Sequence, residues 1–291
     1  MAEVTATTRT VSVTTYVFWF AAFCVTSAGM TIGNKVVMKE FRAPYTLLGF
    51  QQVVAVSVYV ALHFAIGQHD VKSMWHIKPV TLPQVRRLLI IGVNFTFILA
   101  TSLKALPLVT VATVVVFRNL CTCVVALIEH LVMGESFSWQ CWAALLVTVV
   151  GSLVYAGTDI NFNPEGYCWQ VLNSAVFCFG QLYEKWNMTR TTDQTAVGVA
   201  LIKALFTFPI VMVLVPLFGE VEYLRSLESL QVTTVVLAFV TGLGAIGMGL
   251  IYMTLYQIAT ATASTVAGNF NKVVSIIVGS WVFSSSLSSV Q

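Results

Sequence analysis

Charged residues are scarce in this 291-residue chain, where Asp, Glu, Lys and Arg together make up 9% of the sequence. Soluble domains carry about a quarter of such residues and need them to cover their surface. The net charge of +3 is small, and the basic residues do not cluster into a stripe. A nucleic-acid-binding surface is therefore excluded. Because 57% of the residues are apolar, we predict an all-α polytopic membrane protein.

Metal-binding and catalytic signatures are also missing. The six cysteines form no CxxC pair, the four histidines show no ligand spacing, and neither HExxH nor paired carboxylates occur. We therefore predict no metal site, no cofactor and no enzymatic activity. The cysteines are interpreted as free thiols in apolar segments, and a membrane-embedded enzyme is the weakest alternative.

Long apolar runs fill most of the chain, and about twenty such residues are needed to cross a bilayer. The runs lack the alternation of outer-membrane strands, so helices are predicted. We predict nine spans, at 13–33, 44–66, 86–105, 107–132, 139–157, 167–186, 196–218, 231–256 and 260–283. The first is interpreted as a retained helix, and no arginine-rich leader is expected. The distribution of Lys and Arg favours a cytosolic N-terminus.

An internal repeat is suggested by a shift of 150 residues, which places 110–138 on 260–288. Thr110 then meets Thr260, and Asn119 meets Asn269. Transporters are often built from two such repeats. We predict a first five-helix repeat over 1–157 and a second over 158–291. The second is expected to lack its last helix, because the chain stops at Gln291.

Three cations lie inside the predicted spans. Arg118 and Lys272 are central in the two aligned helices, whereas Lys203 lies closer to one end of its helix and could reach the interface. A central Arg or Lys costs about 2.5–3.5 kcal/mol on insertion scales, so it needs a partner or a water-filled cavity. One alternative is that Arg118 pairs with Glu129 or Glu184 and Lys272 with the other glutamate; structural pairing is an alternative for Lys203 as well. Both glutamates lie near predicted helix ends.

The other alternative is an anionic ligand. Arg118 offers a planar fork for a phosphate or diphosphate, and Lys272 offers a compact charge. Gly268 precedes Asn269, Asn271 and Lys272, at a point where a loosened helix could direct N–H groups at an anion. The glycine-rich run 242–249 precedes no Lys-Ser/Thr and is interpreted as a close helix-packing segment.

Two segments resemble the signature motifs of Golgi nucleotide-sugar transporters in the drug/metabolite transporter superfamily. Phe117-Arg118-Asn119-Leu120 is similar to the FKN/FRN segment of the GDP-mannose group, and the five residues 268–272 are similar to its GALNK motif. The stretch 159–167 resembles the family's fifth connection. The resemblance implies a ten-helix fold, of which about nine helices are present here.

The same resemblance implies roles for the site residues. Arg118 and Lys272 would contact the diphosphate, and Asn119 would shape the same pocket. Gly268, Asn269 and Asn271 would lie against the sugar and pyrophosphate. The chain departs from the family's pattern at three places. Asn269-Phe270 stands where the GALNK motif has Ala-Leu, and Ser264 stands where a tyrosine is expected shortly before that motif's glycine. Leu201-Ile202-Lys203-Ala204 stands where fungal members have the FYNN segment that recognises guanine, so the base and sugar of the substrate are left open. Lys203 is kept as a candidate substrate-binding residue.

The function implied is exchange of a cytosolic nucleotide-sugar, with a GDP-mannose-like substrate favoured, for a lumenal nucleoside monophosphate across the Golgi membrane. A UDP-sugar transporter and a phosphate or phosphorylated-sugar translocator of the same superfamily are the alternatives. A membrane receptor or scaffold is the alternative from another class. The predicted partners are the nucleotide-sugar, the nucleoside monophosphate and the lipid bilayer, with no nucleic acid; a homodimer is left open.

Overall fold

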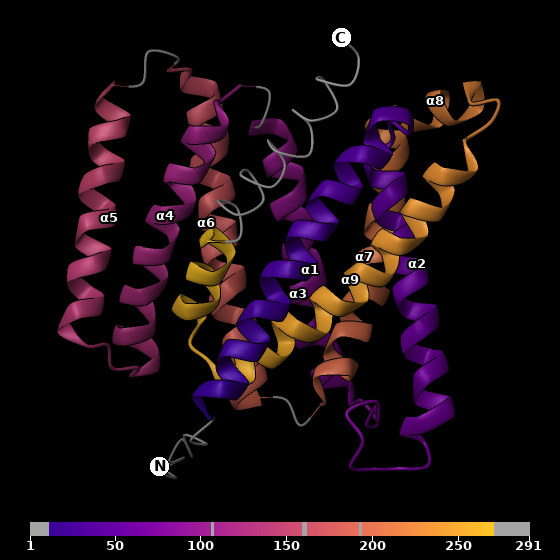
Figure 1. The fold of residues 1–291 in the computed structure, drawn as a ribbon, viewed down its shortest axis with the longest axis horizontal. Coiled ribbons are helices and arrows are strands. Elements are labelled where there is room, and N and C mark those ends of the chain that lie inside the picture. The colour runs from indigo at the N-terminus through magenta and orange to yellow at the C-terminus, as the bar shows by residue number, and fades with distance from the viewer. Residues whose placement is uncertain (1–11, 106–107, 159–161, 192–193, 271–291) are drawn as a thin grey trace.

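The computed structural model describes residues 12–105, 108–158, 162–191 and 194–270, and all regular structure in these ranges is helical (Figure 1). The α-helices are α1 (Val13–Glu40), α2 (Pro44–Leu62), α3 (Leu82–Ala105), α4 (Val111–Ile128), α5 (Trp139–Thr158), α6 (Pro164–Trp186), α7 (Ala196–Leu217), α8 (Glu220–Ser226) and α9 (Val232–Ile258). A further helix is described over 261–270. Helices α2, α4 and α6 each continue into a π-helical turn, at His63–Gly67, Glu129–Met133 and Asn187–Thr191.

The predicted spans each overlap one of these helices, and the chain is an all-helical, multi-pass membrane protein. Within the described ranges, six helices are long and apolar enough to cross a membrane: α1, α2, α3, α4, α7 and α9. The apolar part of α5, Trp139–Val154, is shorter. Helix α6 has 23 residues but is more polar, since it carries buried Gln170, Asn173 and Glu184.

Some predicted boundaries were wrong for identifiable reasons. Helix α1 continues past the expected end at residue 33 to Glu40, because polar residues end the apolar run without breaking the helix. The chain instead turns just before Pro44, where Ala43 lies outside the helical region of the backbone (φ −124°, ψ 81°), as a following proline favours. The expected loop 219–230 contains the short α8.

Helix starts follow ordinary capping chemistry. The side chains of Ser12, Thr110, Asn163 and Thr195 each accept a hydrogen bond from an N–H in the first turn. Thr260 does the same for the helix at 261–270, by accepting from Ala263 N at 3.0 Å. Thr110 and Thr260 are the residues that the 150-residue shift superposes. The shared capping role is consistent with the 150-residue shift that aligns these two segments. The division of the chain into two repeats stays a prediction.

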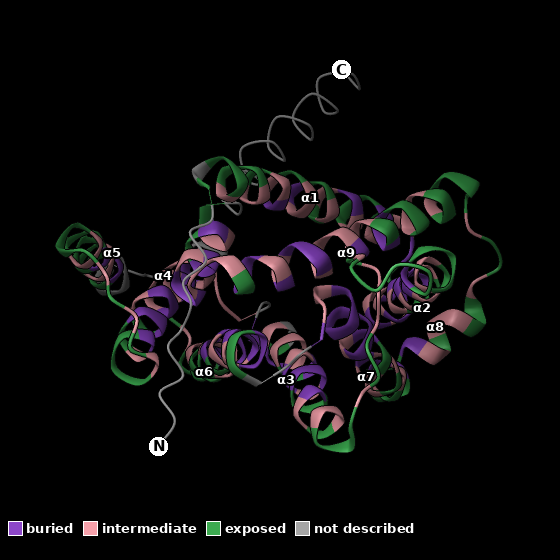
Figure 2. Cartoon of the chain, turned by 90° about the horizontal axis from the view of Figure 1, so that it is seen from below, coloured by how far each residue is buried: buried purple, intermediate pink, exposed green. Residues whose placement is uncertain are grey.

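Seen end-on, the helices turn their buried faces inward, with α1 against α9 and α2 against both α7 and α9 (Figure 2). Helix α3 packs on α6 and α7, and α4 packs on α5 and α6. The glycine-rich run in α9 provides the close approach predicted for it. A Cβ on Gly244 would lie 2.8 Å from Met30 Cγ, and one on Gly249 would lie 2.8 Å from Tyr59 Oη.

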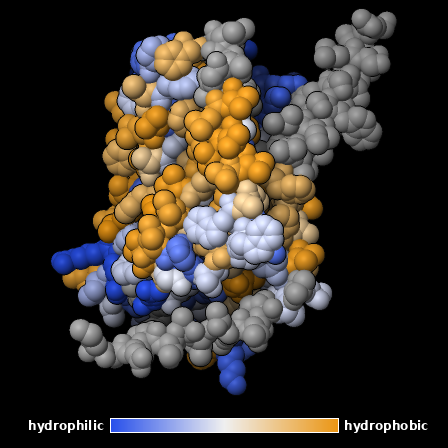
Figure 3. All heavy atoms as spheres, turned by 90° about the vertical axis from the view of Figure 1, so that its left-hand side faces the viewer, coloured by the Kyte–Doolittle hydropathy of each residue, from blue (hydrophilic) through white to orange (hydrophobic). Residues whose placement is uncertain are grey.

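The outer surface is apolar, as expected of a protein that faces lipid. On the side formed by α5 and α4, hydrophobic side chains dominate and the most hydrophilic ones gather towards one end (Figure 3). Exposed Leu146, Val147 and Val150 lie along α5. This surface would be unfavourable in water but matches a bilayer.

Two buried glutamates hold helix ends together across long sequence separations. Glu129 accepts hydrogen bonds from the backbone N–H groups of Ala261 and Thr262 at 2.6 and 2.7 Å, and from the Thr262 hydroxyl at 2.6 Å. Glu220 binds the start of α2 in the same way, through the N–H groups of Tyr45 and Thr46 and the Thr46 hydroxyl. Each carboxylate lies where a helix N-terminus presents free N–H groups and positive potential.

Removing either carboxylate should therefore destabilise the protein. Hydrogen bonds to charged groups contribute about 1.5–3 kcal/mol each, so Glu129→Ala or Glu220→Ala should cost about 3 kcal/mol or more. Thermal unfolding of detergent-purified protein, followed by size-exclusion chromatography, measures the change. Exposed Glu228 offers a matched control, since Glu228→Ala should leave the melting temperature unchanged. Equal melting temperatures for all three variants would contradict the assignment.

Candidate functional site

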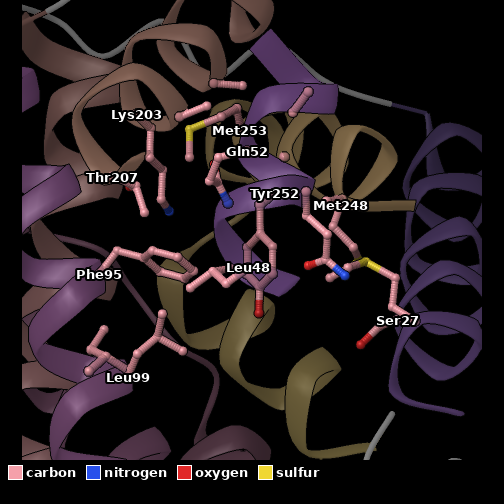
Figure 4. A pocket seen from close by; sticks show the side chains of 18 of the residues that line it. Ser27, Leu48, Gln52, Phe95, Leu99, Lys203, Thr207, Met248, Tyr252 and Met253 are labelled. Carbon is pink, nitrogen blue, oxygen red and sulfur yellow. The ribbon is translucent and has the colours of Figure 1, made fainter. Parts of the chain in front are cut away.

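A cavity of about 550 Å³ lies between α1, α2, α3, α4, α6, α7 and α9. Its volume is in the range of small-molecule binding sites. Among the described residues, three charged side chains line it: Arg118, Glu184 and Lys203. Its aromatic lining consists of Tyr59, Phe95, Phe177 and Tyr252. Figure 4 shows Lys203, Thr207 and Phe95 on one side of the cavity and Ser27 and Met248 on the other.

Arg118 is buried at the cavity wall without a carboxylate partner among the described residues. It lies in the third turn of α4 and is 8% exposed. Its Nη2 donates to Asn173 Oδ1 at 3.0 Å, and the guanidinium lies 3.9 Å from the centre of the Phe177 ring. Its Nη1 is buried and has no hydrogen-bond partner in the described part of the chain. A buried guanidinium with an unused donor is suited to bind an anion.

Asn173 fixes the position of this guanidinium. Its Nδ2 donates to Ile98 O at 2.7 Å and to Thr101 Oγ1 at 2.8 Å, so its Oδ1 is oriented towards Arg118. From the other side, Asn269 Nδ2 donates to Arg118 O at 3.2 Å and to Thr122 Oγ1 at 2.9 Å. The segment around Arg118 is thus held by α3, α6 and the helix at 261–270.

Lys203 and Glu184 form an ion pair in the cavity wall, with Nζ 2.6 Å from Oε1. Their side chains are 21% and 9% exposed. Lys203 Nζ also lies 4.9 Å from the centre of the Phe95 ring. Pairing was one alternative predicted for Lys203, and the structure confirms it. The pairing considered for Arg118 with Glu129 or Glu184 is not found, because both carboxylates have other partners.

A neutral polar cluster forms a further part of the cavity. Gln51 Nε2 donates to Asn34 Oδ1 at 2.8 Å and to Thr241 Oγ1 at 3.0 Å. Asn34 and Gln51 both line the cavity, together with Gln52. Amide groups of this kind can donate to and accept from hydroxyl groups.

The structure brings together part of the predicted site. Arg118 and Lys203 line the cavity, whereas Asn119 is not part of its described lining. Gly268 lies beside it, since a Cβ there would be 3.8 Å from Tyr252 Oη, and Asn269 contacts Arg118. Asn271 and Lys272 lie outside the described residues. The substrate-binding roles of all seven residues stay predictions.

Sequence reasoning missed Gln51 and Glu184 as parts of the cavity, and Asn173 as the partner of Arg118. Gln51 and Asn173 are both amide side chains inside predicted membrane spans, where polar residues are costly, and that position could have marked them. Glu184 was expected near a helix end, and α6 does end at Trp186, but a π-helical turn then continues to Thr191. Its neighbour Lys185 points elsewhere and donates to the carbonyls of Tyr256 and Ala259 at the end of α9.

A sequence profile of the Triose-phosphate Transporter family matches residues 12–291. The chain belongs to this family. It is 24% identical to the GDP-mannose transporter GONST1 of Arabidopsis thaliana over 90% of this chain and 79% of that protein. It is 24% identical to GONST2 over 92% of this chain and 72% of that protein. It is 27% identical to the human nucleotide sugar transporter SLC35D2 over 53% of this chain and 44% of that protein.

These relatives confirm the predicted resemblance to nucleotide-sugar transporters, and the chain is a transporter rather than an enzyme. Membership of a transporter family also fits the position of the cavity. In such proteins substrate sites lie between helices, near the middle of the bilayer.

The Arg118–Asn173 geometry yields a prediction about anion binding. Asn173→Asp should place a carboxylate against the guanidinium and so compete with an anionic ligand. We expect stabilisation of wild type by pyrophosphate, read as a melting-temperature shift in detergent, and a loss of most of that shift in Asn173→Asp. Asn163→Asp is the matched control on α6, because Asp caps a helix as well as Asn. An undiminished shift in Asn173→Asp would argue against anion binding at Arg118.

Proposed function

We propose that this protein exchanges a cytosolic nucleotide-sugar for a lumenal nucleoside monophosphate, with a GDP-mannose-like substrate favoured. The observation that carries the proposal is the Arg118 guanidinium at the wall of a cavity of about 550 Å³, where it has no carboxylate partner among the described residues and one unused donor, Nη1. Uncompensated buried cations are costly, and a phosphate or diphosphate would supply the missing negative charge. The relatives' names, GDP-mannose and nucleotide sugar transporter, supply the ligand class.

The cavity offers separate environments for the parts of such a ligand. Arg118 would bind the diphosphate, joined by the predicted Lys272. The neutral amides of Asn34 and Gln51 suit sugar hydroxyls, which both donate and accept hydrogen bonds. Transport would proceed by alternating access of the two predicted repeats around this site, and no bond in the substrate would change.

The proposed location is the Golgi membrane, with the N-terminus in the cytosol. Golgi glycosyltransfer from nucleotide-sugars leaves nucleoside monophosphate in the lumen after hydrolysis, so an exchanger there would have its counter-substrate at hand. The distribution of Lys and Arg between connections supports the orientation. Assembly as a homodimer is left open.

A phosphorylated-sugar translocator is the second candidate, because the matching family profile is described by triose phosphate. Such a substrate would use Arg118 but would leave much of the cavity unfilled. Competition in one assay separates the two functions. Triose phosphate should compete weakly with a nucleotide-sugar if the first proposal holds, and strongly if the second does.

Reconstituted exchange tests the proposed function. Liposomes that contain the purified chain and internal GMP or UMP should take up labelled GDP-mannose or a UDP-sugar, and uptake should depend on the internal nucleotide. Arg118→Ala should reduce exchange at least a hundredfold, since it removes the cation that binds the phosphates. Arg225→Ala, at an exposed position on α8, should exchange like wild type. Wild-type rates in Arg118→Ala, or no nucleotide-dependent uptake, would refute the proposal.

A further inference from the structure

The Lys203–Glu184 pair presents an ordered row of hydrogen-bonding groups to the cavity. Lys203 Nζ has donors beyond the one used on Glu184 Oε1. Glu184 Oε2 accepts no hydrogen bond from the described residues. The two side chains come from α7 and α6, and both line the cavity. An adjacent ligand would therefore meet an ammonium donor beside a carboxylate acceptor.

Nucleobases differ in the groups on their Watson–Crick edges. Guanine presents an acceptor, O6, followed by two donors, N1–H and the N2 amino group. Uracil presents acceptor, donor and acceptor. Adenine and cytosine place an amino donor where guanine has O6. A protein distinguishes these edges by matching donors to acceptors.

We propose that Lys203 and Glu184 select guanine as the base of the transported nucleotide. Lys203 donates to O6, and the Glu184 carboxylate accepts from N1–H and the N2 amino group. This inference rests on the proposed function and specifies which nucleotide-sugars the site takes. It gives the ion pair a role beyond mutual neutralisation.

Other bases meet a mismatch at the same pair. Uracil would face the carboxylate with its O2, so that two acceptors oppose each other. Adenine and cytosine would direct an amino group at the Lys203 ammonium, so that two donors oppose each other. Sites built on buried polar groups reject analogues strongly, because the unmatched group loses its water without gaining a partner.

Phe95 lies beside this pair in the cavity lining, with the Lys203 ammonium over its ring. Its ring centre lies 4.9 Å from Lys203 Nζ, and Figure 4 shows the two side chains on the same side of the cavity. Aromatic side chains bind bases by stacking with little preference among them. Phe95 would thus contribute affinity, and the ion pair would contribute selectivity.

Competition on the wild-type chain tests the inference without any variant. GMP, IMP, XMP and UMP are titrated against bound labelled GMP on the full chain in detergent. IMP lacks only the N2 amino group, and XMP replaces it with an oxygen. Loss of one hydrogen bond to a charged group corresponds to a tenfold or larger change in affinity. We expect GMP to bind at least tenfold more tightly than IMP, with UMP and XMP weaker still.

A Glu184→Gln variant, tested in the same nucleotide competition, provides the second test. The amide can accept from only one of guanine's two donors, so the ratio of GMP to IMP affinity should fall to near one. Glu165→Gln, at an exposed position in the first turn of α6, is the matched control and should keep the wild-type ratio. Should Glu184→Gln fail to fold, the four-nucleotide competition on wild type still decides.

The outcomes separate this inference from the proposed function. Equal affinity for GMP and IMP in wild type, an unchanged ratio in Glu184→Gln, or tighter binding of UMP than GMP overturns guanine selection and leaves nucleotide-sugar transport standing. Binding of none of the four nucleotides overturns nucleotide-sugar transport itself, and guanine selection with it. The expected ratio in wild type and its collapse in Glu184→Gln support both.

Discussion

The cost of burying charge governs how this chain folds and what its cavity can bind. Glu129 and Glu220 are neutralised by helix N-termini, Lys185 by the carbonyls at the end of α9, and Glu184 by Lys203. Among the buried ionised groups of the described residues, Arg118 has only a neutral amide and an aromatic face. In the described part of the chain, backbone groups at helix ends satisfy three of these charges, a lysine satisfies the fourth, and the Arg118 guanidinium has no ionic partner.

The buried charged residues at the helix ends are connected to the cavity through the helices that they bind. Glu129 binds the first turn of the helix at 261–270, and the last described turn of the same helix carries Asn269, which binds the backbone of α4 at Arg118. Lys185 lies next to Glu184 on α6 and holds the end of α9. Helix-terminus bonds outside the cavity therefore set the positions of the side chains inside it. This arrangement suits a carrier, because helix-terminus contacts can be broken and remade as rigid helices tilt.

Composition and apolar run length were sufficient to predict the helices, because bilayer thickness allows few alternatives. The same features did not predict helix ends such as Glu40, because polar residues there end the apolar run while the helix continues. The site was only partly predictable. Arg118 was evident because a central arginine is costly, but Asn173 and Gln51 matter through partners far away in sequence, at Ile98 and Thr241. The resemblance located the predicted anion-binding segment, whereas the Lys203–Glu184 pairing depends on the packing of both α6 and α7 on α3.

An unpaired cation also gives a physical reason for exchange, if the protein works as proposed. A carrier that returns empty must reorient with Arg118 uncompensated in a low-dielectric interior, and a buried charge without its partner costs about 3–5 kcal/mol. A bound phosphate removes that cost. A nucleoside diphosphate-sugar brings two negative charges, one on each of its esterified phosphates. A nucleoside monophosphate brings close to two near pH 7, since its second phosphate pKa is about 6. Either can therefore compensate the same cations, so reorientation with one of them bound is faster than reorientation of the empty carrier. Coupling between the two substrates then follows from the electrostatics of one residue, without a separate gate that senses occupancy.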